Sequence, residues 1–63
     1  MTQSFTDYLE IISLGENLTE EQAVDSMKQI LEGRVSSEEI AAFLLGMRAK
    51  GETVAELTGF VKQ

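Results

Sequence analysis

The side chains best suited to chemistry in this 63-residue sequence are carboxylates, because it contains neither cysteine nor histidine. Glu20-Glu21 and Glu38-Glu39 are adjacent pairs, and two carboxylates in different environments can divide the roles of general acid and general base. Both pairs, however, stand in the first turn of a predicted helix, where acids interact favourably with the helix dipole. We therefore interpret them as helix-start residues. No further ligands stand near them, and we expect no catalytic, cofactor-binding or metal-binding residue in this chain.

A second chemical motif is Asp25-Ser26-Met27, which resembles the Asp-Ser-Leu at which acyl carrier proteins carry phosphopantetheine. Such carriers are also small, acidic and helical, so an acyl-carrier-like protein is one hypothesis. In a carrier the serine begins a helix after a long loop, whereas Ser26 falls in the middle of a predicted amphipathic helix. The motif therefore favours a helix-interior serine over an attachment site.

The charge of the chain excludes several partners. The formal net charge is −6, and the five cationic side chains are scattered: Lys28, Arg34, Arg48, Lys50 and Lys62. Nucleic-acid binding depends on clustered Lys and Arg, so we expect no nucleic-acid partner. No apolar run reaches the roughly 18 residues of a membrane span, and the N-terminus lacks the regions of a signal peptide. We expect a cytoplasmic protein without membrane contact.

The elements that carry these residues are four predicted helices, over about 4–14, 20–32, 37–50 and 54–62. Capping residues predict each start, namely Ser4, Thr19 with Gln22, Ser36 with Glu39, and Thr53 with Glu56. Gly15, Gly33 and Gly51 separate the helices at intervals of eighteen residues. The sequence therefore predicts one all-α domain over residues 1–63, a compact bundle of four short helices with antiparallel neighbours.

The predicted helix 37–50 is apolar nearly all round, which is typical of a helix covered on several sides. Ile40, Phe43, Leu44 and Met47 form one stripe on it, and Ala42, Gly46 and Ala49 form a second stripe of small residues. A mid-helix glycine costs about 1 kcal/mol relative to alanine, which suggests close packing at Gly46. We expect this helix to be central, with its small residues left over for a partner.

Two other helices have apolar sides that need cover. Ala23, Val24, Met27, Ile30 and Leu31 should form the buried side of the second helix, and Val54, Leu57, Phe60 and Val61 the apolar side of the last. In the first helix, Ile11 and Leu14 fall off the main apolar face. A 63-residue chain buries only about 60% of its unfolded surface. The candidate partner-interface residues are therefore Ile11, Leu14, Ala42, Gly46 and Ala49.

The order of these segments resembles the N-terminal helical domain of anthranilate phosphoribosyltransferase, in the glycosyltransferase family 3 and pyrimidine nucleoside phosphorylase superfamily. The residues that carry the resemblance are Leu18-Thr19-Glu20-Glu21-Gln22-Ala23, Gly33 with Val35 and Ser36, Ile40-Ala41-Ala42-Phe43-Leu44, and Arg48-Ala49-Lys50-Gly51-Glu52-Thr53. The Lys-Gly-Glu-Thr order and the short first helix fit the anthranilate branch better than the nucleoside phosphorylases.

The resemblance implies a parent enzyme that transfers phosphoribose from phosphoribosyl pyrophosphate to anthranilate, with magnesium, in tryptophan biosynthesis. None of that enzyme's phosphate-loop, metal or acceptor motifs matches residues 1–63, so we expect the isolated chain to be inactive. The implied partners are a second copy, in a homodimer, or a large α/β catalytic domain. Because the last helix reaches Gln63 without a stop signal, we expect the chain to end inside a helix. A free-standing helical interaction module stays open as the alternative.

Overall fold

The computed structural model describes residues 4–62, which contain four α-helices and no strand. The helices are α1 (Phe5–Ser13), α2 (Glu20–Leu31), α3 (Ser37–Lys50) and α4 (Val54–Lys62). The Cα radius of gyration is 10.3 Å, close to the roughly 11 Å of a compact folded chain of this length. The predicted all-α, four-helix fold is confirmed. The expected helix end at Gln63 lies outside the described residues.

The predicted helix starts are confirmed by their hydrogen bonds. Thr19 with Gln22 and Ser36 with Glu39 each form a capping box, in which both reciprocal bonds are present. At Ser4 the side chain accepts a bond from the Asp7 amide. The three predicted stop glycines all have positive φ, between 74° and 81°. Only glycine adopts this conformation at no steric cost, so the chain reverses at these points.

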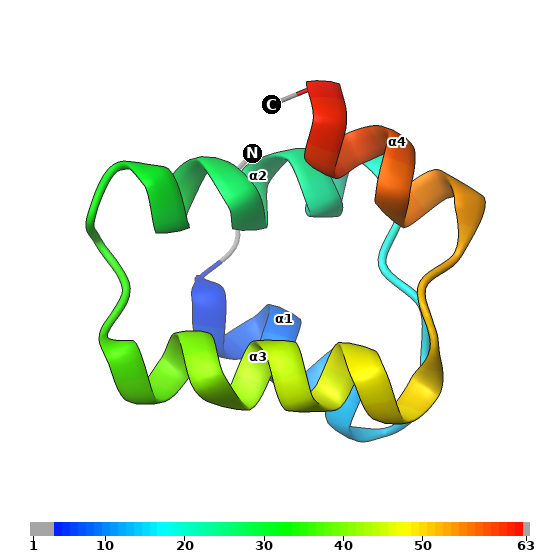
Figure 1. Cartoon of the computed structure of the whole chain (residues 1–63), viewed down its shortest axis with the longest axis horizontal. Coiled ribbons are helices and arrows are strands. Elements are labelled where there is room, and N and C mark those ends of the chain that lie inside the picture. Colours follow the sequence, from blue (N-terminus) through cyan, green and yellow to red (C-terminus); the bar gives the residue numbers. More distant parts are fainter. Residues whose placement is uncertain (1–3, 63) are drawn as a thin grey trace.

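Alternate helices pack most closely in this fold. α4 lies against α2, and α1 lies against α3, while α2 and α3 run in opposite directions and are joined at one end by residues 32–36 (Figure 1). The other end carries two connections, between α1 and α2 and between α3 and α4. The molecule is thus two helix pairs facing each other across a core.

The core comes mainly from α1 and α3. It contains Phe5, Tyr8, Ile12, Leu18, Phe43 and Met47. Phe43 also contacts Phe60 of α4 with its ring centroid 6.1 Å away, at an interplanar angle of 69°. Gly46 is half-buried, and a Cβ there would lie 2.9 Å from the Ile12 Cδ1 atom. The predicted close packing at Gly46 is therefore confirmed, and within this chain it is α1 that approaches.

The prediction that α3 is covered on several sides is wrong for this chain. Leu44 is 61% exposed and Leu45 68%, and Ala41, Ala42 and Ala49 are exposed as well. The reason is geometric: α3 packs closely against α1, while α2 and α4 pack against each other. Only one side of α3 meets the core.

The predicted buried side of α2 is partly wrong. Ala23 is fully buried, but the other buried residues of α2 are Ser26 and Gln29, and Leu31 is exposed. α4 comes very close to α2, because a Cβ added at Gly59 would lie 2.5 Å from the Glu20 carbonyl oxygen and 2.6 Å from the Ala23 Cβ. This close approach covers the start of α2 around Ala23, whereas Leu31, at the other end of the helix, lies on the surface.

The apolar side of α4 largely faces outward. Val54, Leu57 and Val61 are exposed, and only Phe60 of the four predicted apolar residues packs against the core. The fully buried residues of α4 are instead Glu56 and Gly59. The predicted apolar side of α4 is therefore only partly turned to the core: Phe60 meets it, and the other three residues remain exposed.

Candidate functional site: an apolar surface and a buried ion pair

The paired acids act at helix starts, as interpreted. Glu39 accepts a bond from the Ser36 amide, 3.1 Å away, within the α3 capping box. Glu20 forms an exposed ion pair with Lys62 at 2.8 Å, which ties the start of α2 to the end of α4. Among residues 4–62 no group of three potential metal ligands comes together. These carboxylates therefore stabilise helices, and their geometry offers no acid–base pair.

Ser26 is unsuited to carry a prosthetic group. Its side chain is fully buried in the middle of α2, where the hydroxyl donates to the Ala23 carbonyl oxygen at 2.9 Å. The preceding Asp25 accepts bonds from the Tyr8 hydroxyl at 2.5 Å and the Gln29 amide at 2.8 Å. Asp25 thus connects α2 to α1 and Ser26 is a buried residue in the helix interior, so the acyl-carrier interpretation is wrong.

Several large apolar side chains of residues 4–62 are exposed. We call the exposed large side chains the outward apolar surface: Leu14, Leu31, Leu44, Leu45, Val54, Leu57 and Val61. Within it, Val54, Leu57 and Val61 are spaced as i, i+3 and i+7, so they follow one side of α4, which we call the α4 stripe. Exposed apolar side chains that adjoin on one side of a helix can form a contact site. None of the helices in residues 4–62 has the length and apolarity needed to cross a membrane.

The five residues predicted for a partner interface fall into two groups. Leu14, Ala42 and Ala49 are exposed, and Leu14 is exposed by 74%. Ile11 is half-buried and packs against the core cluster, and Gly46 lies against Ile12. Sequence reasoning missed Leu45 and the α4 stripe, which offer more exposed apolar area than the small residues do.

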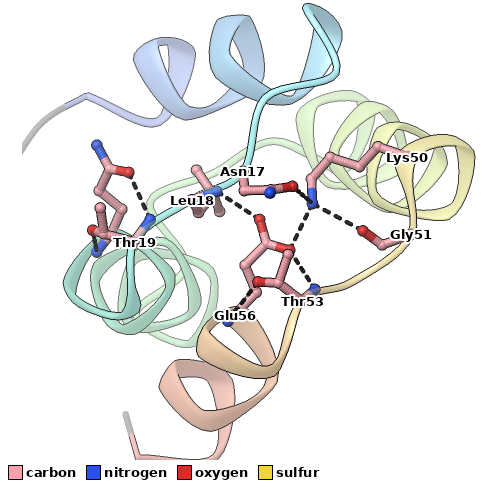
Figure 2. Close-up of polar contacts among 8 residues, drawn as sticks. Asn17, Leu18, Thr19, Lys50, Gly51, Thr53 and Glu56 are labelled. Atoms are coloured by element: carbon pink, nitrogen blue, oxygen red, sulfur yellow. Dashed lines mark hydrogen bonds and ion pairs between the residues drawn. The ribbon is translucent and has the colours of Figure 1, made fainter.

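Sequence reasoning also missed a buried ion pair between the end of α3 and the start of α4. Lys50 Nζ lies 2.6 Å from Glu56 Oε1, and the two side chains are 5% and 0% exposed. Figure 2 shows the lysine nitrogen between three acceptors, since it also donates to Asn17 Oδ1 at 3.2 Å and the Gly51 carbonyl oxygen at 3.0 Å. The Lys50 ammonium is thus almost completely buried, and it donates to three hydrogen-bond acceptors.

Glu56 is provided with donors in the same way. Its Oε1 accepts from the Thr53 amide at 2.9 Å as well as from Lys50, and its Oε2 accepts from the Leu18 amide at 2.6 Å (Figure 2). The Glu56 amide in turn donates to the Thr53 hydroxyl at 3.1 Å. The predicted Thr53–Glu56 capping box is confirmed. The Glu56 carboxylate also accepts a hydrogen bond from the amide of Leu18, which lies 38 residues earlier in the sequence.

Two opposing effects determine the pKa of Glu56. Burial is the largest single effect and raises the pKa, because it disfavours the charged carboxylate. The hydrogen bond from Lys50, those from the Leu18 and Thr53 amides, and the charge of Lys50 all lower the pKa. Together they outweigh burial, so the pKa of Glu56 lies below its ordinary value of 4.5. The carboxylate is therefore ionised at neutral pH and the pair is a salt bridge.

Capped helices, a buried ion pair at one end and several exposed large apolar side chains characterise this helical bundle. The model described as "Glycosyl transferase family, helical bundle domain" matches residues 6–63. This chain belongs to that family of helical bundle domains.

Similar curated proteins carry the name anthranilate phosphoribosyltransferase. That of Pelotomaculum thermopropionicum is 52% identical over 48 residues, which cover 76% of this chain and 14% of that protein. That of Leifsonia xyli subsp. xyli is 42% identical over 59 residues, or 94% of this chain and 17% of that protein. That of Desulforamulus reducens is 37% identical over 57 residues, or 90% and 16%. The chain spans about a sixth of the length of these relatives, and no solved structure gives a significant match.

Proposed function

We propose that the chain functions as the N-terminal helical domain of an anthranilate phosphoribosyltransferase, a scaffold on which an α/β catalytic body is assembled. The parent enzyme would transfer phosphoribose from phosphoribosyl pyrophosphate to anthranilate. The observation that carries the proposal is that one helical bundle domain matches nearly the whole chain. The relatives named anthranilate phosphoribosyltransferase are about six times as long as this chain. The cytoplasmic location expected from the sequence belongs to the same proposal.

The outward apolar surface supports a scaffold role. Seven large apolar side chains of residues 4–62 are exposed, at a cost of roughly 25 cal/mol for every Å² of apolar area left in water. A 63-residue chain has few ways to hide such a surface, and contact with a larger body is one of them. The α/β domain or a second copy would cover it. Ile11, Leu14, Ala42, Gly46 and Ala49 stay candidates for that contact, with Leu45 and the α4 stripe added.

Catalytic chemistry would reside outside this chain. Magnesium is implied for the parent enzyme, but the residues described here do not fit a magnesium site, because no three potential ligands come together among them. Glu39 and Glu56 belong to helix caps, and Glu20 and Glu56 form ion pairs with lysines. The contribution of this domain to the reaction would therefore be positioning of the larger domain, and the isolated chain should not turn over anthranilate.

A domain exchange tests the proposal. The matching N-terminal residues of the Pelotomaculum thermopropionicum protein would be replaced by this chain, and transfer of phosphoribose to anthranilate would be assayed. We expect the hybrid to keep most of the activity, and a hybrid with Leu44→Glu and Leu45→Glu to lose it through poor docking. Glu38→Gln, an exposed change on the same helix, is the matched control. A folded, soluble hybrid without activity would contradict the proposal and would favour a free-standing interaction module.

A further inference from the structure

Two chain connections meet at one end of the molecule, and the buried ion pair lies where they meet. The connection between α1 and α2 and the connection between α3 and α4 lie at the same end, opposite residues 32–36 (Figure 1). Glu56 accepts a bond from Leu18 in the first connection and from Thr53 in the second. Lys50 donates to Asn17 of the first connection as well. One carboxylate and one ammonium therefore join both connections.

The start of α4 has little else to hold it. Its fully buried residues are Glu56 and Gly59, and neither supplies an apolar side chain. Val54 and Leu57, on the first turns, are exposed by 82% and 52%. The apolar anchor of α4, Phe60, comes one turn after Glu56, where it packs against Phe43. The beginning of this helix is thus attached mainly by polar contacts.

We propose that Lys50 and Glu56 form a latch that fixes the first turn of α4 to the connection between α1 and α2. When the latch breaks, both segments are released together, while α1 and α3 stay packed. The latch then sets the direction in which the α4 stripe faces. This inference rests on the geometry of the pair and does not depend on the proposed parent enzyme.

Acid should open the latch. Lys50, from α3, is the charged group that contacts Glu56 among the described residues. On α2, which packs against α4, Glu20 is paired with Lys62 at the far end of α4. Protonation of Glu56 removes the charge that balances Lys50, and an unbalanced buried ammonium is strongly unfavourable. Movement of the first turn of α4 would let Lys50 reach water.

The first test is a pH titration of the full chain, in which the chemical shifts of the Leu18 and Thr53 amide protons are recorded at each pH. We expect both amides to follow one shared midpoint below pH 4.5, the ordinary pKa of Glu56, with the helical circular dichroism unchanged through that midpoint. Glu39→Gln, the same position of another capping box, should leave both curves unchanged. Separate midpoints for the two amides, or a midpoint that coincides with loss of helix, would overturn the latch.

The second test is amide hydrogen exchange in Glu56→Gln. Loss of a charged hydrogen-bond acceptor should speed exchange of the Leu18 and Thr53 amides together by about tenfold or more. The amides of Phe43 and Met47 in α3 should change by less than about threefold on the same argument. Equal acceleration along the whole chain, or no acceleration at Leu18, would overturn the proposal. If this variant does not fold, the titration of the unaltered chain decides alone.

Discussion

Two helices in this protein begin with the same capping-box pattern, but the two capping glutamates differ in burial and in the groups they bind. Ser36 with Glu39 begins α3, and Thr53 with Glu56 begins α4, each by a reciprocal capping box. Glu39 remains partly in water and binds only Ser36. Glu56 is wholly buried and binds Lys50 and Leu18 in addition. The same local motif therefore caps only its own helix at α3. At α4 it also connects segments that are distant in the sequence, and we call such a cap a tertiary joint.

The difference comes from what surrounds each carboxylate. Solvent screens the Glu39 carboxylate, so its interactions contribute the modest free energy of an ordinary cap. Around Glu56 there is no water to compensate a missing partner, so each donor has to be present. If this comparison is right, changes at the α4 start are far more costly than matched changes at the α3 start.

The largest expected effect is that of Lys50→Met, which removes the cation and leaves the Glu56 carboxylate buried. Breaking a buried pair by removing one partner costs about 3 to 5 kcal/mol of unfolding free energy. Because the Leu18 and Thr53 amides still donate, we expect the lower end of that range. Urea denaturation followed by circular dichroism measures it.

The control for this variant is Lys62→Met, which breaks the exposed pair with Glu20. The two side chains are 60% and 43% exposed, and such a pair contributes about 0 to 1 kcal/mol. Equal losses for Lys50→Met and Lys62→Met would show that burial makes no difference at the α4 start.

A smaller loss is expected for Gly59→Ala, which attacks the attachment of α4 without touching a charge. The added Cβ would lie 2.5 Å from the Glu20 carbonyl oxygen, a backbone atom that cannot move away freely. Overpacking of this kind costs about 1 to 3 kcal/mol. Thermal unfolding measures the loss. Gly46→Ala is the matched control, because the obstructing atom there is the end of the flexible Ile12 side chain; a greater loss at Gly46 would contradict the close α2–α4 approach.

Acid should remove the contribution of the buried Glu56 cap to the free energy of unfolding. Because the pKa of Glu56 is lowered in the folded chain, its contribution to stability is fully present above the ordinary value of 4.5. It is lost as the pH falls through the lowered pKa. We expect the unfolding free energy of the chain to decrease as the pH is lowered from 4.5, and to decrease less in Lys50→Met. Urea midpoints at several pH values measure this, and identical pH dependence of both proteins would contradict the assignment.

The smallest effect is expected for Glu39→Gln. Glutamine keeps an oxygen that accepts from the Ser36 amide, and glutamine is itself a residue of capping boxes. We expect a loss of less than about 1 kcal/mol, measured by urea denaturation. A loss as large as that of Lys50→Met would mean that the α3 cap is a tertiary joint as well.

The helix starts and stops could be predicted because their signals are local. A capping serine and a glutamate three residues later act across one helical turn, and a glycine reverses the chain wherever it stands. The burial of Glu56 could not be found in this way, because its partner Leu18 lies 38 residues away. The one available hint was Lys50, six residues before Glu56 across the Gly51 turn.

Predictions about which side is buried were weaker, because apolar periodicity indicates a side of a helix without saying what will cover it. The α4 stripe is a true apolar side, yet it faces away from the core because Glu56 and Gly59 take the inner positions. Gly46 is a point of close approach, as its place inside a helix predicts, and Gly59, also inside a helix, is a second one that apolar periodicity does not indicate. Helix α3 looked central for the same reason, although its Leu44 and Leu45 are exposed.

The most direct test of the difference between the two caps is a side-by-side measurement of Glu39→Gln and Glu56→Gln. Urea denaturation at pH 7 gives the unfolding free energy of each relative to the unaltered chain. The two substitutions are chemically identical, and both fall at the third helical position of a capping box. We predict a loss of about 3 kcal/mol or more for Glu56→Gln and less than about 1 kcal/mol for Glu39→Gln. Equal losses would contradict the conclusion that the α4 cap is a buried tertiary joint.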